Sequence, residues 1–305
     1  MSCDYVIPAK AGMTEPDFMQ LGDIRIDRIL EMETPFMTPA AMFPDSTPDD
    51  IDRHRHWLEP WALDPRTGKI IINIQTYLIR TPRHTIIVDT CLGCDKTNPF
   101  FPDWHMRSDR AWYAALGAHG VQPAEVDYVF CTHLHSDHCG WNTQLVDGRW
   151  VPTFPNARYI MAEKELQHAA AANSPAYRES VLPCVEAGQV QGVAADFALD
   201  DSVWLEATHG HTPGHVAVHL RSGQHRAVLC GDLIHSPLQC HYPRWRYWID
   251  SDARQAILTR EKFLHEQCAE RRLVLTAHFP RSSIGYVEAA GDAFRFHFIN
   301  WDDAR

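Results

Sequence analysis

The sequence predicts one α/β domain with its β-sheets inside and its helices outside. Segments with strand-like and helix-like patterns alternate along all 305 residues, which is typical of layered α/β folds. Apolar residues make up 45% and charged residues 22% of the chain, which is the composition of an ordinary globular protein. No stretch has the composition of a linker, so we interpret residues 1–305 as a single domain.

The N-terminal part is predicted to combine strands with less regular segments. Residues 1–20 show no clear pattern and are interpreted as an N-terminal arm. Residues 33–68 are rich in proline and lack a clear period. Because long irregular segments usually serve a function, we interpret them as an insertion that forms a lid or a dimer contact. Alternating apolar residues predict strands at 24–30, 70–79 and 85–88, the last two joined by a turn at 81–84.

The remainder of the chain alternates between helices and strands. Ser108 and Ser251 stand where helix N-caps are expected, and Gly120 stands where the first of these helices ends. Helices are predicted at 108–119, 161–173, 175–185 and 251–271. Strands are predicted at 126–131, 204–208, 216–220, 227–230, 273–276 and 294–298.

Charge and cysteine content exclude several classes of protein. The chain has 28 basic and 39 acidic residues, a net charge of −11, and no basic stripe that would bind nucleic acid. No apolar run approaches the roughly 18 residues of a membrane span, and no secretory signal precedes residue 20. The nine cysteines are irregularly spaced, so we expect reduced thiols and a cytoplasmic protein without membrane or nucleic-acid partners.

The most informative motif follows the predicted strand 126–131. Three histidines and an aspartate lie within six residues: His133, His135, Asp137 and His138. Residues two apart in an extended segment share one side, so His133 and His135 can face the same ion. Asp137 and His138 can then turn toward a second ion. Imidazole and carboxylate ligands together suit zinc, iron, nickel or manganese better than calcium or magnesium.

Further ligand-type side chains follow at later strand ends. The segment 209–215 reads His-Gly-His-Thr-Pro-Gly-His, and its small residues let the backbone turn so that His215 completes the first set of ligands. His209 and His211 are interpreted as supporting residues instead. Asp232 follows an apolar strand and can bridge two cations, and His278 stands at the end of the last predicted core strand.

These motifs resemble those of the metallo-β-lactamase superfamily. The matching elements are HLHSDH, GHTPGH, the Gly-Asp pair after a strand and the late strand-end histidine, in the same order over nearly the whole chain. The resemblance implies a four-layer αβ/βα sandwich with a binuclear metal site at one edge of the two sheets. It assigns one metal to His133, His135 and His215 and the other to Asp137, His138 and His278, with Asp232 as the bridge.

The resemblance also implies a reaction. Two divalent cations about 3.5–4 Å apart hold a bridging hydroxide that attacks a carbonyl or phosphoryl centre. Zinc is favoured, with manganese, iron and cobalt as alternatives. Asp137 is expected to orient the nucleophile or move its proton. Asp89, near a strand end, is expected to support the ligands.

Within the superfamily, the chain looks most like the methyl parathion hydrolase and N-acyl homoserine lactonase branch. We therefore expect hydrolysis of a lactone or neutral ester, with a side activity on phosphotriesters, in a homodimer. In such lactonases a tyrosine often lies three residues after the bridging aspartate; here that residue is His235. It acts either as a hydrogen-bond donor in catalysis or as a support for the ligands.

Aromatic residues near these motifs predict the wall of a substrate pocket. Phe100, Phe101 and Trp104 precede the first helix, Trp141 follows the metal motif, and a second aromatic run contains Tyr242, Trp245, Tyr247 and Trp248. We expect Phe101, Trp104, Trp141, Tyr242 and Trp245 to line an apolar pocket.

Three alternatives stay open. A glyoxalase-II-like thioesterase normally has a basic C-terminal region for glutathione, which we do not see after His278. An iron-dependent persulfide dioxygenase uses a single iron, which fits a seven-ligand site less well. A non-catalytic scaffold would usually have lost ligands, and this chain keeps a residue at every position.

Overall fold

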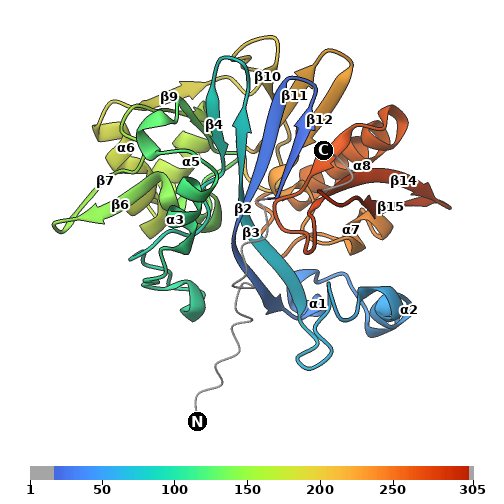
Figure 1. Cartoon of the computed structure of the whole chain (residues 1–305). Coiled ribbons are helices and arrows are strands. Elements are labelled where there is room, and N and C mark those ends of the chain that lie inside the picture. Colours follow the sequence, from blue (N-terminus) through green and yellow to red (C-terminus); the bar gives the residue numbers. More distant parts are fainter. Residues whose placement is uncertain (1–16, 302–305) are drawn as a thin grey trace.

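A computed structural model describes residues 17–301. Two β-sheets pack against each other in the middle of the molecule, and helices cover their outer faces (Figure 1). α3, α5 and α6 lie beside one sheet, and α8 and α7 lie beside the other. This arrangement is the four-layer sandwich that the motifs implied.

The first sheet has seven strands in the order β1-β2-β3-β4-β5-β8-β9. Neighbours from β1 to β4 are antiparallel, and those from β4 to β9 are parallel. The strands are β1 Phe18–Leu21, β2 Ile24–Met37, β3 Ile70–Arg80, β4 Thr85–Val88, β5 Tyr128–Phe130, β8 Arg158–Ala162 and β9 Val190–Val193.

The second sheet has six strands in sequence order, β10 to β15. Only its β12–β13 pair is parallel, and α8 connects these two strands. Its strands are β10 Val203–Ala207, β11 Val216–Ser222, β12 His225–Leu229, β13 Leu273–Leu275, β14 Ile284–Ala290 and β15 Ala293–Phe298. A separate hairpin consists of β6 Thr143–Val146 and β7 Arg149–Pro152.

The helices connect these strands. The α-helices are α1 Pro39–Met42, α2 Pro48–Leu58, α3 Ala111–Ala118, α4 Ser136–Cys139, α5 Glu163–Ala172, α6 Leu182–Glu186, α7 Leu238–His241 and α8 Ala253–Glu270. Shorter helical turns are η1 Pro102–Trp104, η2 Pro123–Glu125, η3 Gly140–Asn142, η4 Tyr177–Val181 and η5 Gly231–Leu233. Among the described residues no helix is long and apolar enough to cross a membrane.

The period of two along each strand produces the layers. Ile86 and Val88 of β4 pack with Val218 of β11 in the apolar core between the sheets. Ile87, between them in sequence, faces the other way and joins the core under α3. In the second sheet, Val228 of β12 likewise faces outward into the core under α8. Strands with two buried faces read as apolar runs, which is why the sequence predicted them.

The predicted elements occur in the predicted order, but several boundaries are wrong, and strands β6, β7, β9 and β14 were not predicted. Part of the predicted arm forms β1, while residues 1–16 lie outside the described range. The stretch 33–68 is less irregular than predicted, because it holds the end of β2, α1 and α2. Thr47 and Asp50 form a capping box at the start of α2. Asp252, and not Ser251, caps α8.

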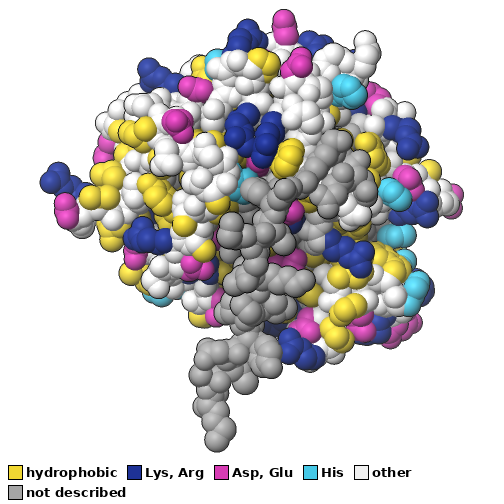
Figure 2. Space-filling model, in the orientation of Figure 1, with side chains coloured by type: hydrophobic (Ala, Val, Ile, Leu, Met, Phe, Trp, Pro, Cys, Tyr) yellow, Lys and Arg dark blue, Asp and Glu magenta, His cyan; other side chains and the backbone are white. Residues whose placement is uncertain are grey.

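On the face shown in Figure 2, basic and acidic side chains are interspersed rather than gathered into separate patches.

Candidate metal centre

The ligand-type residues converge at one edge of the sandwich from both sheets. The segment 133–138 follows β5 of the first sheet. His211, Asp232 and His278 follow β10, β12 and β13 of the second sheet. Because each residue stands just beyond a strand end, the two rigid sheets fix their relative positions.

These residues form two groups whose ligand atoms lie within 4.8 Å of one another. The first group is His133, His135, His211 and Asp232, and the second is Asp137, His138 and His278. His135 Nδ1 lies 3.0 Å from both His133 Nε2 and His211 Nε2. In the second group, His138 Nε2 lies 3.3 Å from His278 Nε2.

Asp232 connects the two groups. Its Oδ2 lies 3.3 Å from His211 Nε2 and 3.6 Å from His133 Nε2. Its Oδ1 lies 3.1 Å from His138 Nε2 and 3.0 Å from His278 Nε2. Oδ1 is buried and makes no hydrogen bond within residues 17–301. A carboxylate that offers one oxygen to each group fits the predicted bridge between two cations.

The prediction for segment 209–215 requires a correction: the structure groups His211, and not His215, with the other ligands. His211 Nδ1 lies 3.1 Å from Asp250 Oδ1, so a carboxylate orients the ring and its Nε2 faces the site. Such carboxylate–histidine pairs commonly orient metal-binding histidines.

His215 has no free nitrogen for a cation. Its Nε2 accepts a hydrogen bond from the backbone N–H of Asp232 at 3.0 Å, so the proton of the neutral ring is on Nδ1. That nitrogen lies 2.8 Å from Thr208 Oγ1 and donates to it. Gly231 has a φ of 50°, and a Cβ there would lie 2.7 Å from His215 Nε2. His215 therefore supports the turn that carries Asp232.

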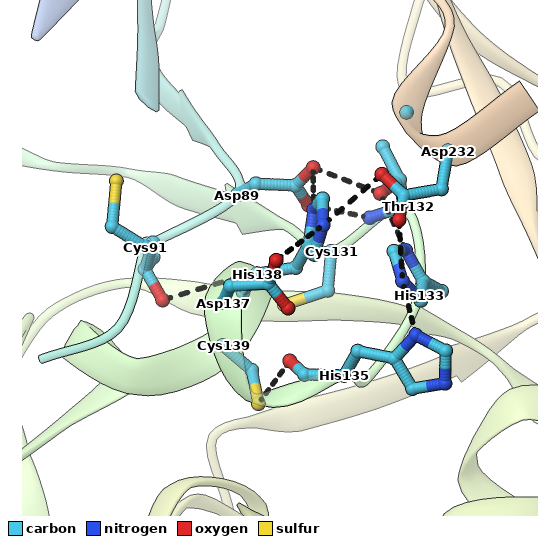
Figure 3. A network of polar contacts seen from close by, with 12 residues as sticks. Asp89, Cys91, Cys131, Thr132, His133, His135, Asp137, His138, Cys139 and Asp232 are labelled. Atoms are coloured by element: carbon cyan, nitrogen blue, oxygen red, sulfur yellow. Dashed lines mark hydrogen bonds and ion pairs between the residues drawn. The ribbon is translucent and has the colours of Figure 1, made fainter. Parts of the chain in front are cut away.

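Asp89 orients the first segment, as expected. Its carboxylate accepts hydrogen bonds at 2.8 Å from the backbone N–H and from the hydroxyl of Thr132, and its Oδ2 lies 2.9 Å from His138 Nδ1 (Figure 3). His138 Nε2 is thereby directed toward Asp232 and His278. His209, which was predicted to be a supporting residue, lies with Nδ1 3.2 Å from the carbonyl oxygen of His215.

Burial and neighbouring charge set the protonation of this centre. Burial holds the pKa of His133 and His135 well below the usual range, so both rings are neutral and offer lone pairs. Burial also lowers the pKa of His211, but hydrogen bonds to Asp232 and Asp250 outweigh it and raise the pKa to about 9. A bound cation would displace that proton, since metal binding releases protons from its ligands.

A buried arginine fixes the loop beside this centre. Arg260 of α8 donates 2.8 Å hydrogen bonds to the carbonyl oxygens of Leu233, Pro243 and Trp245. Its guanidinium also lies 3.6 Å from Asp250 Oδ2. The same side chain thus holds the residue after Asp232, the aromatic run at 242–248 and the carboxylate that orients His211.

Arg260→Met should therefore destabilise the protein by about 3 kcal/mol or more, because it removes a buried positive charge from beside Asp250 and leaves three carbonyl oxygens without their donor. Denaturant unfolding of the variant and the parent measures the difference. Arg254→Met, an exposed arginine on the same helix, is the matched control and should change the free energy of unfolding by less than about 0.5 kcal/mol. Equal effects of the two substitutions would contradict this role of Arg260.

A cavity of about 340 Å³ opens over the two groups. His135, Asp137 and Asp232 form its polar floor. Its walls are mainly apolar and include Phe36, Phe100, Phe101, Trp104, Trp248 and Ile249. Phe101 and Trp104 therefore lie where the sequence predicted them.

The other three predicted wall residues do not line this cavity. Trp141 is fully buried, stacks on Trp112 and donates a 2.7 Å hydrogen bond to Glu31 Oε1. Tyr242 and Trp245 stack on each other, with ring centroids 4.1 Å apart. Trp245 belongs to the buried apolar core, and Tyr242 packs against that core.

His235 lies behind the bridging carboxylate. It is fully buried, its Nε2 lies 3.1 Å from Asp232 Oδ2, and it is not part of the cavity wall. The ring of Tyr247 covers it, with centroids 3.5 Å apart and planes 11° apart. Burial lowers the pKa of His235 to about 4, so the ring is neutral. Of the two predicted roles, this position favours the supporting one.

The fold and the paired ligand groups define a class of sandwich proteins with a two-metal centre at one edge of their sheets. The model of the metallo-beta-lactamase superfamily matches residues 72–283, and the chain belongs to that superfamily. The resemblance found in the sequence is thereby confirmed.

Among curated relatives, N-acyl homoserine lactonase AiiA of Bacillus thuringiensis subsp. kurstaki is 29% identical over 181 residues, which cover 55% of this chain and 66% of the relative. The match thus spans just under two thirds of that relative. N-acyl homoserine lactonase AttM of Azorhizobium caulinodans is 41% identical over 64 residues, 21% of each chain.

Solved structures share the whole fold. The hydrolase AbOPH of the beta lactamase superfamily aligns with a TM-score of 0.76 at 21% identity, over 95% of this chain and all of the other. AidC, a dizinc quorum-quenching lactonase in complex with its product, aligns with a TM-score of 0.74 at 20% identity, over 94% of this chain and 99% of AidC.

Proposed function

We propose that this protein is a metal-dependent hydrolase that opens the ring of a lactone, with N-acyl homoserine lactones as the substrate class. The observation that carries the proposal is the position of the two ligand groups, joined by Asp232, at the floor of a largely apolar cavity. The homoserine lactonases among the relatives support the same class.

The chain's own residues divide the work. His133, His135 and His211 would hold one cation, Asp137, His138 and His278 the other, and Asp232 both. Two bound divalent cations supply Lewis acidity and lower the pKa of water toward neutrality. Asp137 faces the cavity beside Asp232 and is placed to orient the attacking water. The aromatic walls would bind an apolar acyl chain and exclude solvent.

Further properties are part of the proposal. Zinc suits a site of imidazole and carboxylate ligands. The cysteines among the described residues are free thiols, which supports a reducing, cytoplasmic setting. We also propose a homodimer, with the stretch 33–68 as lid or contact, and a side activity on phosphotriesters. Light scattering of the purified protein tests the dimer.

A pH-stat assay of the zinc-loaded protein tests the activity. Its panel holds acyl homoserine lactones, simple lactones, an aryl ester, a glutathione thioester and an aryl phosphotriester. We expect the fastest acid release from the acyl homoserine lactones. Turnover of the thioester alone would replace the proposal with a glyoxalase-II-like thioesterase. Oxygen uptake in the presence of a persulfide would replace it with an iron-dependent dioxygenase. Inactivity on every member would refute it.

Phe100 should set the preference for acyl length. Its side chain lies at the cavity wall yet is 77% exposed, so a long acyl chain could cover it. Phe100→Ala should raise KM for a long-chain lactone about tenfold or more, since burying such a ring is worth roughly 1.5–3 kcal/mol. KM for a short-chain lactone should stay unchanged. Met106→Ala, exposed outside the cavity wall, is the control; equal effects on both chain lengths would contradict the prediction.

A further inference from the structure

The cavity floor lacks a histidine donor where the sequence suggested one. His235 is fully buried, and its Nε2 is engaged with Asp232 Oδ2. Its Nδ1 is buried and has no hydrogen-bond partner within the described residues. A substrate in the cavity would meet the residue that covers His235, which is Tyr247.

Tyr247 is the wall residue that combines a phenol with contact to the centre. Its ring stacks on His235 at 3.5 Å and lies 5.6 Å from the ring of His211, between centroids. It lines the same cavity as His135, Asp137 and Asp232. A substrate carbonyl held above Asp232 would therefore lie in the same cavity as the Tyr247 side chain.

The hydroxyl of Tyr247 is available as a donor. A phenol hydroxyl can both accept and donate, so it can accept from the neighbouring indole of Trp248, whose ring centroid lies 6.4 Å away, and still donate its own proton to a substrate.

The position of Tyr247 is also tied to that of His211. The backbone N–H of Tyr247 donates a 2.9 Å hydrogen bond to Asp250 Oδ2, and the other oxygen of the same carboxylate faces His211 Nδ1 at 3.1 Å. The guanidinium of Arg260 forms an ion pair with this carboxylate, 3.6 Å from Asp250 Oδ2. A donor fixed in this way needs little rearrangement during the reaction, which is the condition for strong electrostatic stabilisation.

We propose that Tyr247 is a catalytic residue whose hydroxyl donates a hydrogen bond to the substrate carbonyl oxygen. The inference rests on the proposed lactone hydrolysis. When the hydroxide oxygen adds to the carbonyl carbon, the π electron pair moves onto the carbonyl oxygen, and Tyr247 stabilises that charge without losing its proton. Collapse restores the C=O bond and breaks the ring C–O bond. The leaving alkoxide takes the proton brought by the hydroxide, which gives a carboxylate and an alcohol.

The test is Tyr247→Phe, which keeps the ring stacked on His235 and removes only the hydroxyl. We expect kcat to fall about 100-fold, the typical effect of removing one oxyanion donor, with KM and metal content within about twofold of the parent. The loss should be equal for a lactone and for an aryl ester, because both form the same oxyanion. A cyclic phosphonate, which mimics the oxyanion, should bind about 100-fold more weakly in calorimetry.

Tyr242→Phe is the matched control. Its hydroxyl lies 3.0 Å from His54 Nε2, and the residue is not part of the cavity wall; kcat should stay within twofold. For Tyr247→Phe, an unchanged kcat, a change in KM alone, or a loss seen with the lactone but not with the aryl ester would each overturn the inference. An inactive parent protein would instead refute the proposed function, so the two failures are distinguishable.

Discussion

Asp232→Asn should lower lactone hydrolysis by at least about 100-fold, because even changes to residues that support a ligand cost 10–100-fold in metal affinity or activity. The side chain keeps its shape, but the amide nitrogen cannot replace the oxygen that faces one of the two groups. We expect the bound metal to fall from two equivalents toward one, as measured by elemental analysis, and the circular dichroism spectrum to be unchanged.

Asp196→Asn is the control for this substitution. Asp196 is exposed in the loop between β9 and β10, and its variant should keep both metals and full activity. If Asp232→Asn retained two metals and more than half of the parent activity, Asp232 would not be the bridge.

The pair His211→Ala and His215→Ala gives the second large effect. We expect His211→Ala to lose about one equivalent of metal and at least about 100-fold in activity, because it removes a member of the first group. His215→Ala should keep two equivalents but lower the free energy of unfolding by about 1–3 kcal/mol. That substitution leaves the buried N–H of Asp232 without its acceptor.

Elemental analysis and thermal unfolding of both variants check this pair. The opposite pattern, with metal lost from His215→Ala and retained in His211→Ala, would restore the assignment made from the sequence. The parent protein treated with a chelator is the reference for complete metal loss.

The sequence could predict most of the centre because its residues follow predicted strand ends. His133, His135, Asp137 and His138 stand after β5, and Asp232 and His278 stand after β12 and β13. Their order along the chain and their convergence in space therefore follow from the same alternation of apolar strands.

His211 was missed because spacing does not distinguish two histidines in one turn. A usable signal was present, however. His215 directly precedes β11, so the strand fixes its ring, whereas His211 lies at the turn between the two strands. The carboxylate that orients His211 comes from Asp250, far along the chain, and no local pattern points to it.

The pocket residues show a different difficulty. Trp141 lies three residues after His138, but the turn η3 directs it inward to Glu31. Tyr247 belongs to the same aromatic run as Tyr242, and only the packing of that loop on α8 decides which of them reaches the cavity. Composition predicts that aromatics are present, and tertiary contacts decide which way each one faces.

The ligand groups have a consequence for how the molecule comes together. Each group takes members from both sheets: His133 and His135 join His211, and Asp137 and His138 join His278. Neither half of the chain can therefore complete even one coordination shell alone. A cation bound here would link the two halves of the chain. Metal occupancy would therefore depend on the two sheets being packed against each other. Losing one ion would therefore lower the stability of the whole sandwich as well as the activity.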